Sequence, residues 1–474
     1  MTQDHHASGF KPVAEIPALT GSATVYEDGW QSWSPAGIRP IEATSPRPAR
    51  EIWQTMAYRP ETPAPAAGHQ GEGLVAIRRE PDGPVDLFAA PDPTRAVPSI
   101  RVAHLGDRAL VSANGPVEHL RLEGSWHHVL TTWASMLANR LDVPSPAPVT
   151  PGWCSWYCYW NKVTEQNIVD ELQAMQDLEL PVQTVQIDDG WQAEIGDWTT
   201  TSSRFNDMAA LAERIKQSGR RAGIWTAPFL VGAKSKIAHE HPEWLVKGAI
   251  ACEQQWDQRV GVLDVTHPGA AEHLREVFAT LSNWGYRYFK IDFLYAAAMV
   301  GGRHQDTDPI AAYRTGLQLI RDAIGPDAVL LGCGAPLLAS IGMVDAMRVS
   351  PDVDPSTEPA DGDLSQPALR SALYSGRARA YQHDRWWVND PDCLVLRPEV
   401  EHREAWADHC AALGGLAVSS DPLRSLDPRG LELTRALLQT SRKQGGVWDP
   451  EALNPRGGVD LLTEAQGRLL PHGS

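Results

Sequence analysis

Acidic side chains recur in this sequence where short apolar runs end. The acids concerned are Asp188, Asp189, Asp292, Asp352, Asp390 and Asp392. The runs alternate with amphipathic stretches, a pattern that predicts the buried strands of a parallel sheet. In closed parallel barrels, chemistry gathers at the carboxyl ends of the strands, so we expect these carboxylates to surround one opening.

Lys290 and Asp292 form the pair with the clearest chemical meaning. They stand two residues apart, so on a strand their side chains share a face. A neighbouring ammonium group keeps a carboxylate ionised, and an ionised, positioned carboxylate can attack the anomeric carbon of a sugar. The spacing leaves open a second interpretation, a buried ion pair that closes the barrel.

Asp352 is the candidate for the complementary role. It lies on a Pro-bounded loop after the sixth run, with Arg348 four residues earlier. A retaining glycosidase needs a second carboxyl group about 5–5.5 Å from the first, with a raised pKa, to protonate the leaving oxygen. Asp292 and Asp352 could supply this pair. Spacing alone leaves two other interpretations of Asp352 open, a solvated loop carboxylate and a helix N-cap.

Asp188 and Asp189 precede Gly190 and Trp191. Asp-Gly dipeptides favour turns, which is one interpretation. Adjacent carboxylates beside an indole also suit a sugar, because carboxylates accept from hydroxyls while the indole covers the apolar C–H face. The chain contains 18 Trp, which weakly favours a carbohydrate-related protein.

Short apolar runs alternate with amphipathic stretches over residues 148–445. This alternation predicts a (β/α)₈ TIM barrel, whose strands and helices would position these residues. An open doubly wound sheet is the alternative, but no Gly-rich phosphate loop follows the first run. The eight expected strands are 153–157, 184–187, 223–227, 288–293, 329–333, 346–349, 386–389 and 416–419.

Residues 1–147 are rich in Pro and Gly, contain short β-like runs and predict an N-terminal β-sandwich-like domain. The stretch 142–148 has three prolines and predicts a linker. Residues 446–474 are expected to form a short C-terminal tail, with little or no C-terminal β domain.

The composition excludes several classes of function. Lys plus Arg number 42 and Asp plus Glu 59, a net charge of −17, so we expect no nucleic-acid and no membrane partner. The N-terminus lacks a basic region followed by an apolar one, and six Cys are too few for a disulfide framework. We therefore expect reduced thiols and a cytoplasmic protein. His127 and His128 lie outside the expected barrel, so we predict no metal.

Seven motifs, taken together, resemble glycoside hydrolase family 36, in the clan of retaining α-galactosidases. The resemblance covers about residues 25 to 395. The motifs are DGWQSWSP at 28–35, WCSWY at 153–157, IDDGWQ at 187–192, GIWTAPF at 223–229, KIDF at 290–293, GCGAP at 332–336 and WVNDPDC at 387–393.

The resemblance implies a double-displacement hydrolysis of terminal α-galactosides, without a cofactor. Asp292 would be the nucleophile and Asp352 the acid/base. The implied substrate-binding residues are Asp188 and Asp189 for O4 and O6, Lys290 and Arg348 for hydroxyls near the reacting carbon, Trp156, Tyr157 and Trp225 as lining, Cys333 near C2, and Trp33 reaching over from the N-terminal domain.

Two departures from the family pattern concern the segment around Asp352. Ser350 stands where the family usually has Gly, and 353–357 lacks the aromatic residue that usually follows the acid/base. An α-N-acetylgalactosaminidase, an α-galactosyl transferase and a non-catalytic sugar-binding relative stay open as alternatives. A small oligosaccharide or glycoside is the expected partner, and homo-oligomerisation stays open.

Overall fold

The computed structural model of the protein describes residues 9–146 and 148–440. Its centre is an eight-stranded parallel sheet in the order β19-β18-β17-β16-β12-β11-β10-β20. Leu416, just before β20, donates its backbone N–H to the Asn389 carbonyl in β19 at 2.8 Å, which brings the two ends of the sheet together. The expected TIM barrel is therefore confirmed. Its strands are β10 (Gly152–Cys154), β11 (Thr184–Ile187), β12 (Arg221–Thr226), β16 (Tyr288–Ile291), β17 (Val329–Gly332), β18 (Ala346–Arg348), β19 (Val388–Asp390) and β20 (Val418–Ser419).

The first strand is shorter than its apolar run predicts. The run 153–157 was expected to be one strand, but Trp156 and Tyr157 lie in a short helix directly after β10. Strand and helix cannot be told apart by periodicity in so short an apolar run. The change matters for the site, because a helical turn directs consecutive side chains differently from a strand.

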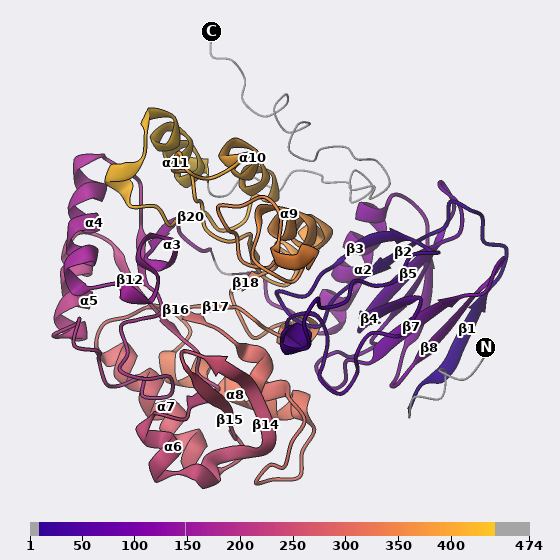
Figure 1. Cartoon of the computed structure of the whole chain (residues 1–474), viewed down its shortest axis with the longest axis horizontal. Helices are drawn as coiled ribbons and strands as arrows, with labels where there is room; N and C mark the ends of the chain where they lie inside the picture. Colours follow the sequence, from indigo (N-terminus) through magenta and orange to yellow (C-terminus); the bar gives the residue numbers. More distant parts are fainter. Residues whose placement is uncertain (1–8, 147, 441–474) are drawn as a thin grey trace.

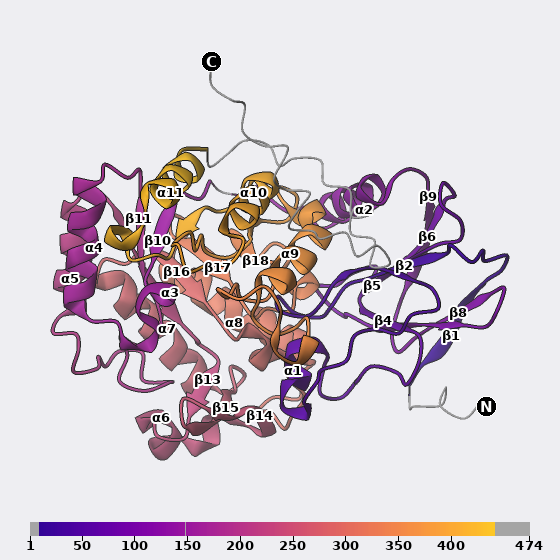
Figure 2. The same ribbon diagram turned by 45° about the horizontal axis from the view of Figure 1, so that its top comes forward.

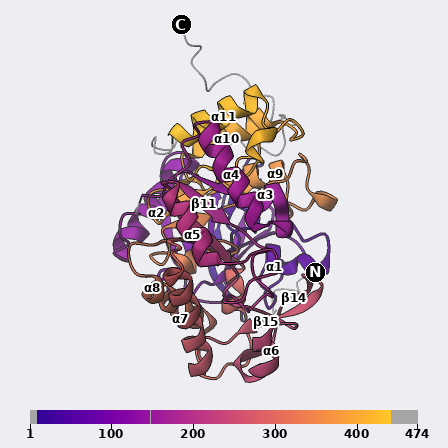
Figure 3. The ribbon, with the colours of Figure 1, turned by 90° about the vertical axis from the view of Figure 1, so that its left-hand side faces the viewer.

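Helices connect and cover the barrel strands, and their ends follow local signals. Thr164 caps α4 in a capping box with Asn167, and α8 ends at Gly325, whose φ of 78° suits glycine. Figure 3 looks onto the side of the barrel covered by α4 and α5. The helices are α3 (Trp156–Tyr159), α4 (Glu165–Asp177), α5 (Met208–Gln217), α6 (Lys236–Glu240), α7 (Pro268–Asn283), α8 (Pro309–Ile324), α9 (Leu369–Ala378), α10 (Arg403–Leu413) and α11 (Pro428–Thr440).

A small antiparallel sheet is inserted between β12 and β16. It consists of β13 (Leu230–Gly232), β14 (Leu245–Gln255) and β15 (Gln258–Leu263), in the order β13-β15-β14. Figure 2 shows it beside α6 at one end of the barrel. The tip of the β14–β15 hairpin contributes to the site described below.

The N-terminal part contains two antiparallel sheets, which lie beside the barrel in Figure 1. One has the order β1-β8-β7-β4 and the other β3-β2-β5-β6-β9, and buried side chains from both sheets form a shared apolar cluster. Helix α2 (Trp126–Arg140) follows them, and α1 (Gln54–Ala57) lies between β3 and β4. The strands are β1 (Lys11–Ile16), β2 (Thr24–Glu27), β3 (Gly37–Pro40), β4 (His69–Glu72), β5 (Leu74–Arg78), β6 (Val85–Ala89), β7 (Ser99–His104), β8 (Ala109–Ala113) and β9 (Glu118–Leu122).

A buried arginine anchors the loop after β2 to the barrel. Arg379, just after α9, forms an ion pair with Asp28 at 2.8 Å, and the two side chains are 0% and 1% exposed. The same guanidinium donates to the carbonyls of Ser32, Ser34 and Val349 at 2.8–3.0 Å. The contacts hold the loop 28–34, which carries Trp33, against the end of β18.

We expect Arg379→Met to destabilise the fold by about 3–5 kcal/mol, because it leaves Asp28 buried without its countercharge. The measurement is urea unfolding followed by fluorescence. Arg370→Met is the matched control, since the Arg370–Glu358 pair is 43% and 62% exposed and should contribute less than about 1 kcal/mol. Equal midpoints for the two variants would contradict this expectation.

No described helix is both long and apolar enough to cross a membrane. The expected tail at 446–474 lies outside the described residues, so the expectation of little or no C-terminal β domain stays a prediction.

Candidate active site

Strands β11 and β16 bring Asp188 and Lys290 together. The Lys290 ammonium donates to Asp188 Oδ2 at 3.0 Å, and the side chains are 7% and 3% exposed. Gln186 and Ser155 also hold Asp188, through its carboxylate at 2.5 Å and its backbone N–H at 2.9 Å. Burial opposes the charge on Lys290, but Asp188 and Asp292 outweigh it and raise the pKa of the lysine well above its usual value. Lys290 is therefore a permanent cation between two carboxylates.

Asp292 directly follows β16 and is 6% exposed. The Trp225 indole N–H donates to its Oδ2 at 3.0 Å, and the Phe293 backbone N–H donates to its Oδ1 at 2.7 Å. Phe293 has a φ of 52°, uncommon for an aromatic residue, and such strain persists where the surroundings over-determine it. Two donors and a nearby cation hold Asp292 in one orientation, which suits a nucleophile.

Asp352 lies beyond β18, and its side chain is 33% exposed. Arg348 forms an ion pair with it at 2.8 Å and also pairs with Asp390 at 3.2 Å and Asp392 at 2.6 Å. Partial burial and then the charge of Asp392 raise the pKa of Asp352 to about 7, although Arg348 acts in the opposite direction. The charge of Asp292 contributes in the same direction as that of Asp392. A carboxyl group that keeps its proton near neutral pH can act as a general acid.

Asp189 receives a hydrogen bond from Trp256, a residue that no sequence motif had marked. The Trp256 indole N–H donates to Asp189 Oδ2 at 2.7 Å, and Gln192 donates to Oδ1 at 2.5 Å. Burial raises the pKa of Asp189. The Trp256 ring also packs edge-on against Phe293, with centroids 5.3 Å apart. A side chain from the inserted sheet therefore touches groups at the ends of both β11 and β16.

The β14–β15 hairpin places Trp256 by means of a tight turn. Gln255 pairs with Gln258, so Trp256 and Asp257 form a two-residue loop, and their φ values are 53° and 55°. Positive φ at both positions matches the type I′ turn, which Asn and Gly usually occupy. Because Trp-Asp is not a turn signature, composition alone did not mark this hairpin.

The remaining expected residues are placed as follows. Tyr157 donates its hydroxyl to Asp392 Oδ2 at 2.5 Å, while the Trp156 ring packs against Trp160 with centroids 5.0 Å apart. Cys333 is fully buried, and burial raises the pKa of its thiol well above the usual value. This thiol therefore stays neutral.

Trp33 comes to the barrel from the N-terminal part of the chain. Its ring lies edge-on to Phe293 at 5.0 Å and to Tyr295 at 6.2 Å. Gly334, with φ of 52°, lies against this ring, and a Cβ there would approach it to 2.7 Å. Trp33 therefore contacts Phe293, the residue that follows Asp292, and its role in binding a substrate stays a prediction.

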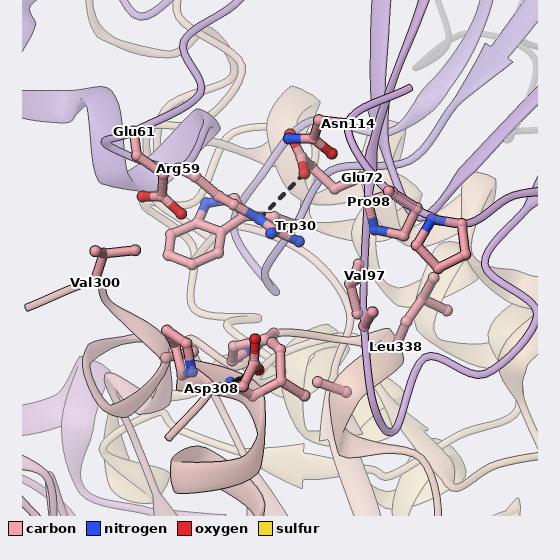
Figure 4. A pocket seen from close by; sticks show the side chains of 18 residues that line it. Trp30, Arg59, Glu61, Glu72, Val97, Pro98, Asn114, Val300, Asp308 and Leu338 are labelled. Carbon is pink, nitrogen blue, oxygen red and sulfur yellow. Dashed lines mark hydrogen bonds and ion pairs between the residues drawn. The ribbon is translucent and has the colours of Figure 1, made fainter. Parts of the chain in front are cut away.

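A cavity of about 320 Å³ lies beside Trp30, between the N-terminal sheets and the barrel (Figure 4). Arg59 and Glu72 form an ion pair on its wall at 3.1 Å. The lining side chains of Trp30, Glu72 and Leu338 are only 5%, 1% and 3% exposed, and the lining does not include Asp188, Asp189, Asp292 or Asp352. This cavity is a gap in the interface between the two parts, separate from the carboxylate site.

The comparisons with known proteins found similar proteins of one kind. The family model described as Melibiase matches residues 145–321. Probable alpha-galactosidase C of Aspergillus flavus is 25% identical over 223 residues, which cover 42% of this chain and 28% of the relative. This chain therefore spans less than a third of the length of that curated relative.

Two solved structures match over nearly their whole length. TtGalA, an alpha-galactosidase from Thermus thermophilus in complex with p-nitrophenyl alpha-D-galactopyranoside, is 30% identical, with 93% of this chain and 92% of that chain covered and a TM-score of 0.76. The same protein in complex with stachyose is 31% identical, with 91% and 95% covered and a TM-score of 0.75.

Proposed function

Because this chain belongs to glycoside hydrolase family 36, we propose that it is a retaining, exo-acting α-galactosidase that hydrolyses terminal α-galactosides of small oligosaccharides. Its family membership rests on the match to TtGalA over nearly the whole length of both chains. The motifs in the sequence had led to the same family.

The observation that carries the proposal is the difference between two interacting carboxyl groups. Asp292 is held by the Trp225 and Phe293 N–H groups, whereas burial and Asp392 favour the protonated form of Asp352. A carboxyl group that keeps its proton suits the general acid of a glycosidase, and a carboxylate held in place by N–H donors suits the nucleophile.

The proposed reaction has two steps. Asp292 attacks the anomeric carbon and forms a covalent galactosyl ester, while Asp352 gives its proton to the departing oxygen. Asp352, now ionised, takes a proton from water, and the water oxygen displaces Asp292 from the sugar. Two inversions at the anomeric carbon give the α-anomer of galactose, and the proton returns to Asp352.

The other site residues would bind the galactose ring. Asp188 and Asp189 would accept hydrogen bonds from O4 and O6, while Lys290 and Arg348 would hold hydroxyls nearer the anomeric carbon. Aromatic faces suit the apolar C–H side of the ring. The residues proposed for this lining are Trp33, Trp156, Tyr157 and Trp225, with Cys333 near C2.

The substrate class follows from the relatives. TtGalA was solved with a nitrophenyl galactoside and with stachyose, so we propose that this chain accepts raffinose-type oligosaccharides. No cofactor takes part in the proposed steps. We further propose that residues 148–445 form the catalytic domain and that residues 1–147 complete the site through Trp33.

The test is a panel of p-nitrophenyl α-glycosides with proton NMR of the first-formed sugar. We expect release from the α-galactoside and initial appearance of α-galactose. A preference for the N-acetylgalactosaminide would instead indicate that alternative, and initial β-galactose would overturn the retaining mechanism. Sugar binding without turnover would indicate a non-catalytic relative.

Trp256→Phe should raise KM for the nitrophenyl α-galactoside about tenfold with little change in kcat. The phenyl ring keeps the packing on Phe293, but Asp189 loses an N–H donor, and a hydrogen bond to a charged group contributes about 1.5–3 kcal/mol. Steady-state kinetics measure KM and kcat separately for the wild type and the variant. Glu253→Gln on the same hairpin is the control, because its ion pair with Arg259 is largely exposed. An unchanged KM in Trp256→Phe would show that Trp256 does not position Asp189 for binding.

A further inference from the structure

Asp392 is a fully buried carboxylate beside the site, and the proposed reaction gives it no step. It is 1% exposed. Its Oδ1 forms an ion pair with Arg348 at 2.6 Å and accepts the Cys393 backbone N–H at 2.6 Å. Its Oδ2 accepts the Tyr157 hydroxyl at 2.5 Å and the Val353 backbone N–H at 2.7 Å. Four donors from three separate segments of the chain meet on this one side chain.

Two of those contacts lead directly to the acid/base. Val353 follows Asp352 in the chain, so the hydrogen bond to its N–H fixes the backbone that carries Asp352. Arg348 is shared, because the guanidinium that pairs with Asp392 also pairs with Asp352 at 2.8 Å. Asp392 therefore acts on both the position and the charge partner of Asp352.

The backbone around Asp392 supports this reading. Its φ is 91°, a conformation that side chains other than glycine rarely adopt, and such strain is kept only where several contacts impose it. The Ser350 hydroxyl donates to the Pro391 carbonyl at 3.2 Å, so the two loops are joined on both sides of Asp352. Ser350 is the position that departs from the family's usual glycine, and its hydroxyl makes this contact.

We propose that Asp392 is a positioning residue for the acid/base, acting through Arg348 and the Val353 N–H, and that it sets the pH range over which Asp352 holds its proton. The proposal rests on the proposed function, because it assumes that Asp352 donates a proton during cleavage.

The charges around Asp352 give the direction of the effect. The guanidinium of Arg348 pairs with three carboxylates, those of Asp352, Asp390 and Asp392. The ionised form of Asp352 is therefore stabilised by only part of the positive charge of Arg348. Without the negative charge of Asp392, Arg348 would pair more strongly with Asp352. The repulsion between the Asp392 and Asp352 carboxylates would also be lost. Both changes favour ionised Asp352. The titratable and charged groups that face the pair are Tyr157, Lys290, Asp292, Cys333, Arg348, Asp390, Cys393 and Cys410.

The experiment compares pH profiles of kcat/KM for raffinose in the wild type and Asp392→Asn. A general acid works only while protonated, so kcat/KM falls above its pKa. We expect the alkaline limb of Asp392→Asn to move down by about one pH unit, the lower end of what a neighbouring charge does. At pH values above both limbs, kcat/KM for raffinose then falls about tenfold relative to the wild type. An aryl galactoside, whose leaving group needs less protonation, should lose less.

Asp390→Asn is the matched control, because it neutralises another carboxylate on the same arginine at 3.2 Å. Its limb should move less than that of Asp392→Asn, since Asp390 does not hold the Val353 N–H. An equal movement would assign the effect to the total charge on Arg348 and overturn the specific role of Asp392. An unchanged limb in folded Asp392→Asn would also overturn it.

If Asp392→Asn does not fold, Tyr157→Phe tests the same link. It removes a donor that favours the charged form of Asp392, so Asp392 carries less negative charge beside Arg348 and the alkaline limb should move to lower pH, as in Asp392→Asn. A limb that stays in place would overturn the proposal. The two hypotheses remain separable. A wild-type protein that is inactive on every α-galactoside would contradict the proposed function. The position of the alkaline limb in the variants decides only the role of Asp392.

Discussion

Asp292→Asn is expected to lower kcat on p-nitrophenyl α-galactoside by a factor on the order of 10⁴ or more, as the loss of a covalent nucleophile does. The amide keeps nearly the same shape and can still accept the Trp225 N–H, so the fold should be retained. The measurement is kcat together with circular dichroism and the thermal midpoint. Activity within tenfold of the wild type would exclude Asp292 as the nucleophile.

Azide distinguishes a nucleophile from a group that only binds. In Asp292→Gly, azide can fill the vacated space and attack the anomeric carbon from the face opposite the leaving group. The expected product is the β-galactosyl azide, identified by NMR. Asp189→Asn is the control, because it alters a proposed binding carboxylate of the same site and should show no azide rescue.

Asp352→Asn is expected to lower kcat/KM for raffinose by about 10²–10⁴-fold, the range for loss of a general acid. The loss should be smaller for an aryl galactoside, because its leaving group departs without full protonation. In Asp352→Ala, azide would attack the galactosyl-enzyme and give the α-galactosyl azide, the opposite anomer from the Asp292 variant. Asp354→Asn, two residues further on the same loop, is the matched control. The Asp354 carboxylate accepts hydrogen bonds from the Ser356 backbone N–H and hydroxyl, and we assign it no part in the reaction.

The wild-type pH profile follows from the same residue. Burial and the charge of Asp392 raise the pKa of Asp352 to about 7, so the fraction carrying the proton falls above that pH. We therefore expect kcat/KM for raffinose to fall about tenfold per pH unit above pH 7, and this fall to disappear in Asp352→Asn. A rate that is level up to pH 9 would contradict the assignment.

Much of the barrel could be predicted because its signals are local. Thr164 caps α4, Pro268 begins α7, and Gly325 ends α8, and each of these residues acts within its own turn of helix. The expected strand 153–157 was wrong for a local reason as well, since a run of five residues, four of them apolar or aromatic, fits either a strand or a helical turn. The eight strand ends then indicated where the carboxylates would gather.

The sequence by itself determined which carboxylates were candidates, because residue type and strand position are written in the order of the chain. It did not reveal Trp256, and it showed Asp392 as a strand-end acid without showing its contacts. The Trp256–Asp189 bond spans 67 residues, and the Tyr157–Asp392 bond spans 235. Only the closed barrel and the inserted hairpin bring such partners within 3 Å. The raised pKa of Asp352 was likewise decided by tertiary structure, because burial and neighbouring charge exist only once distant segments have packed together.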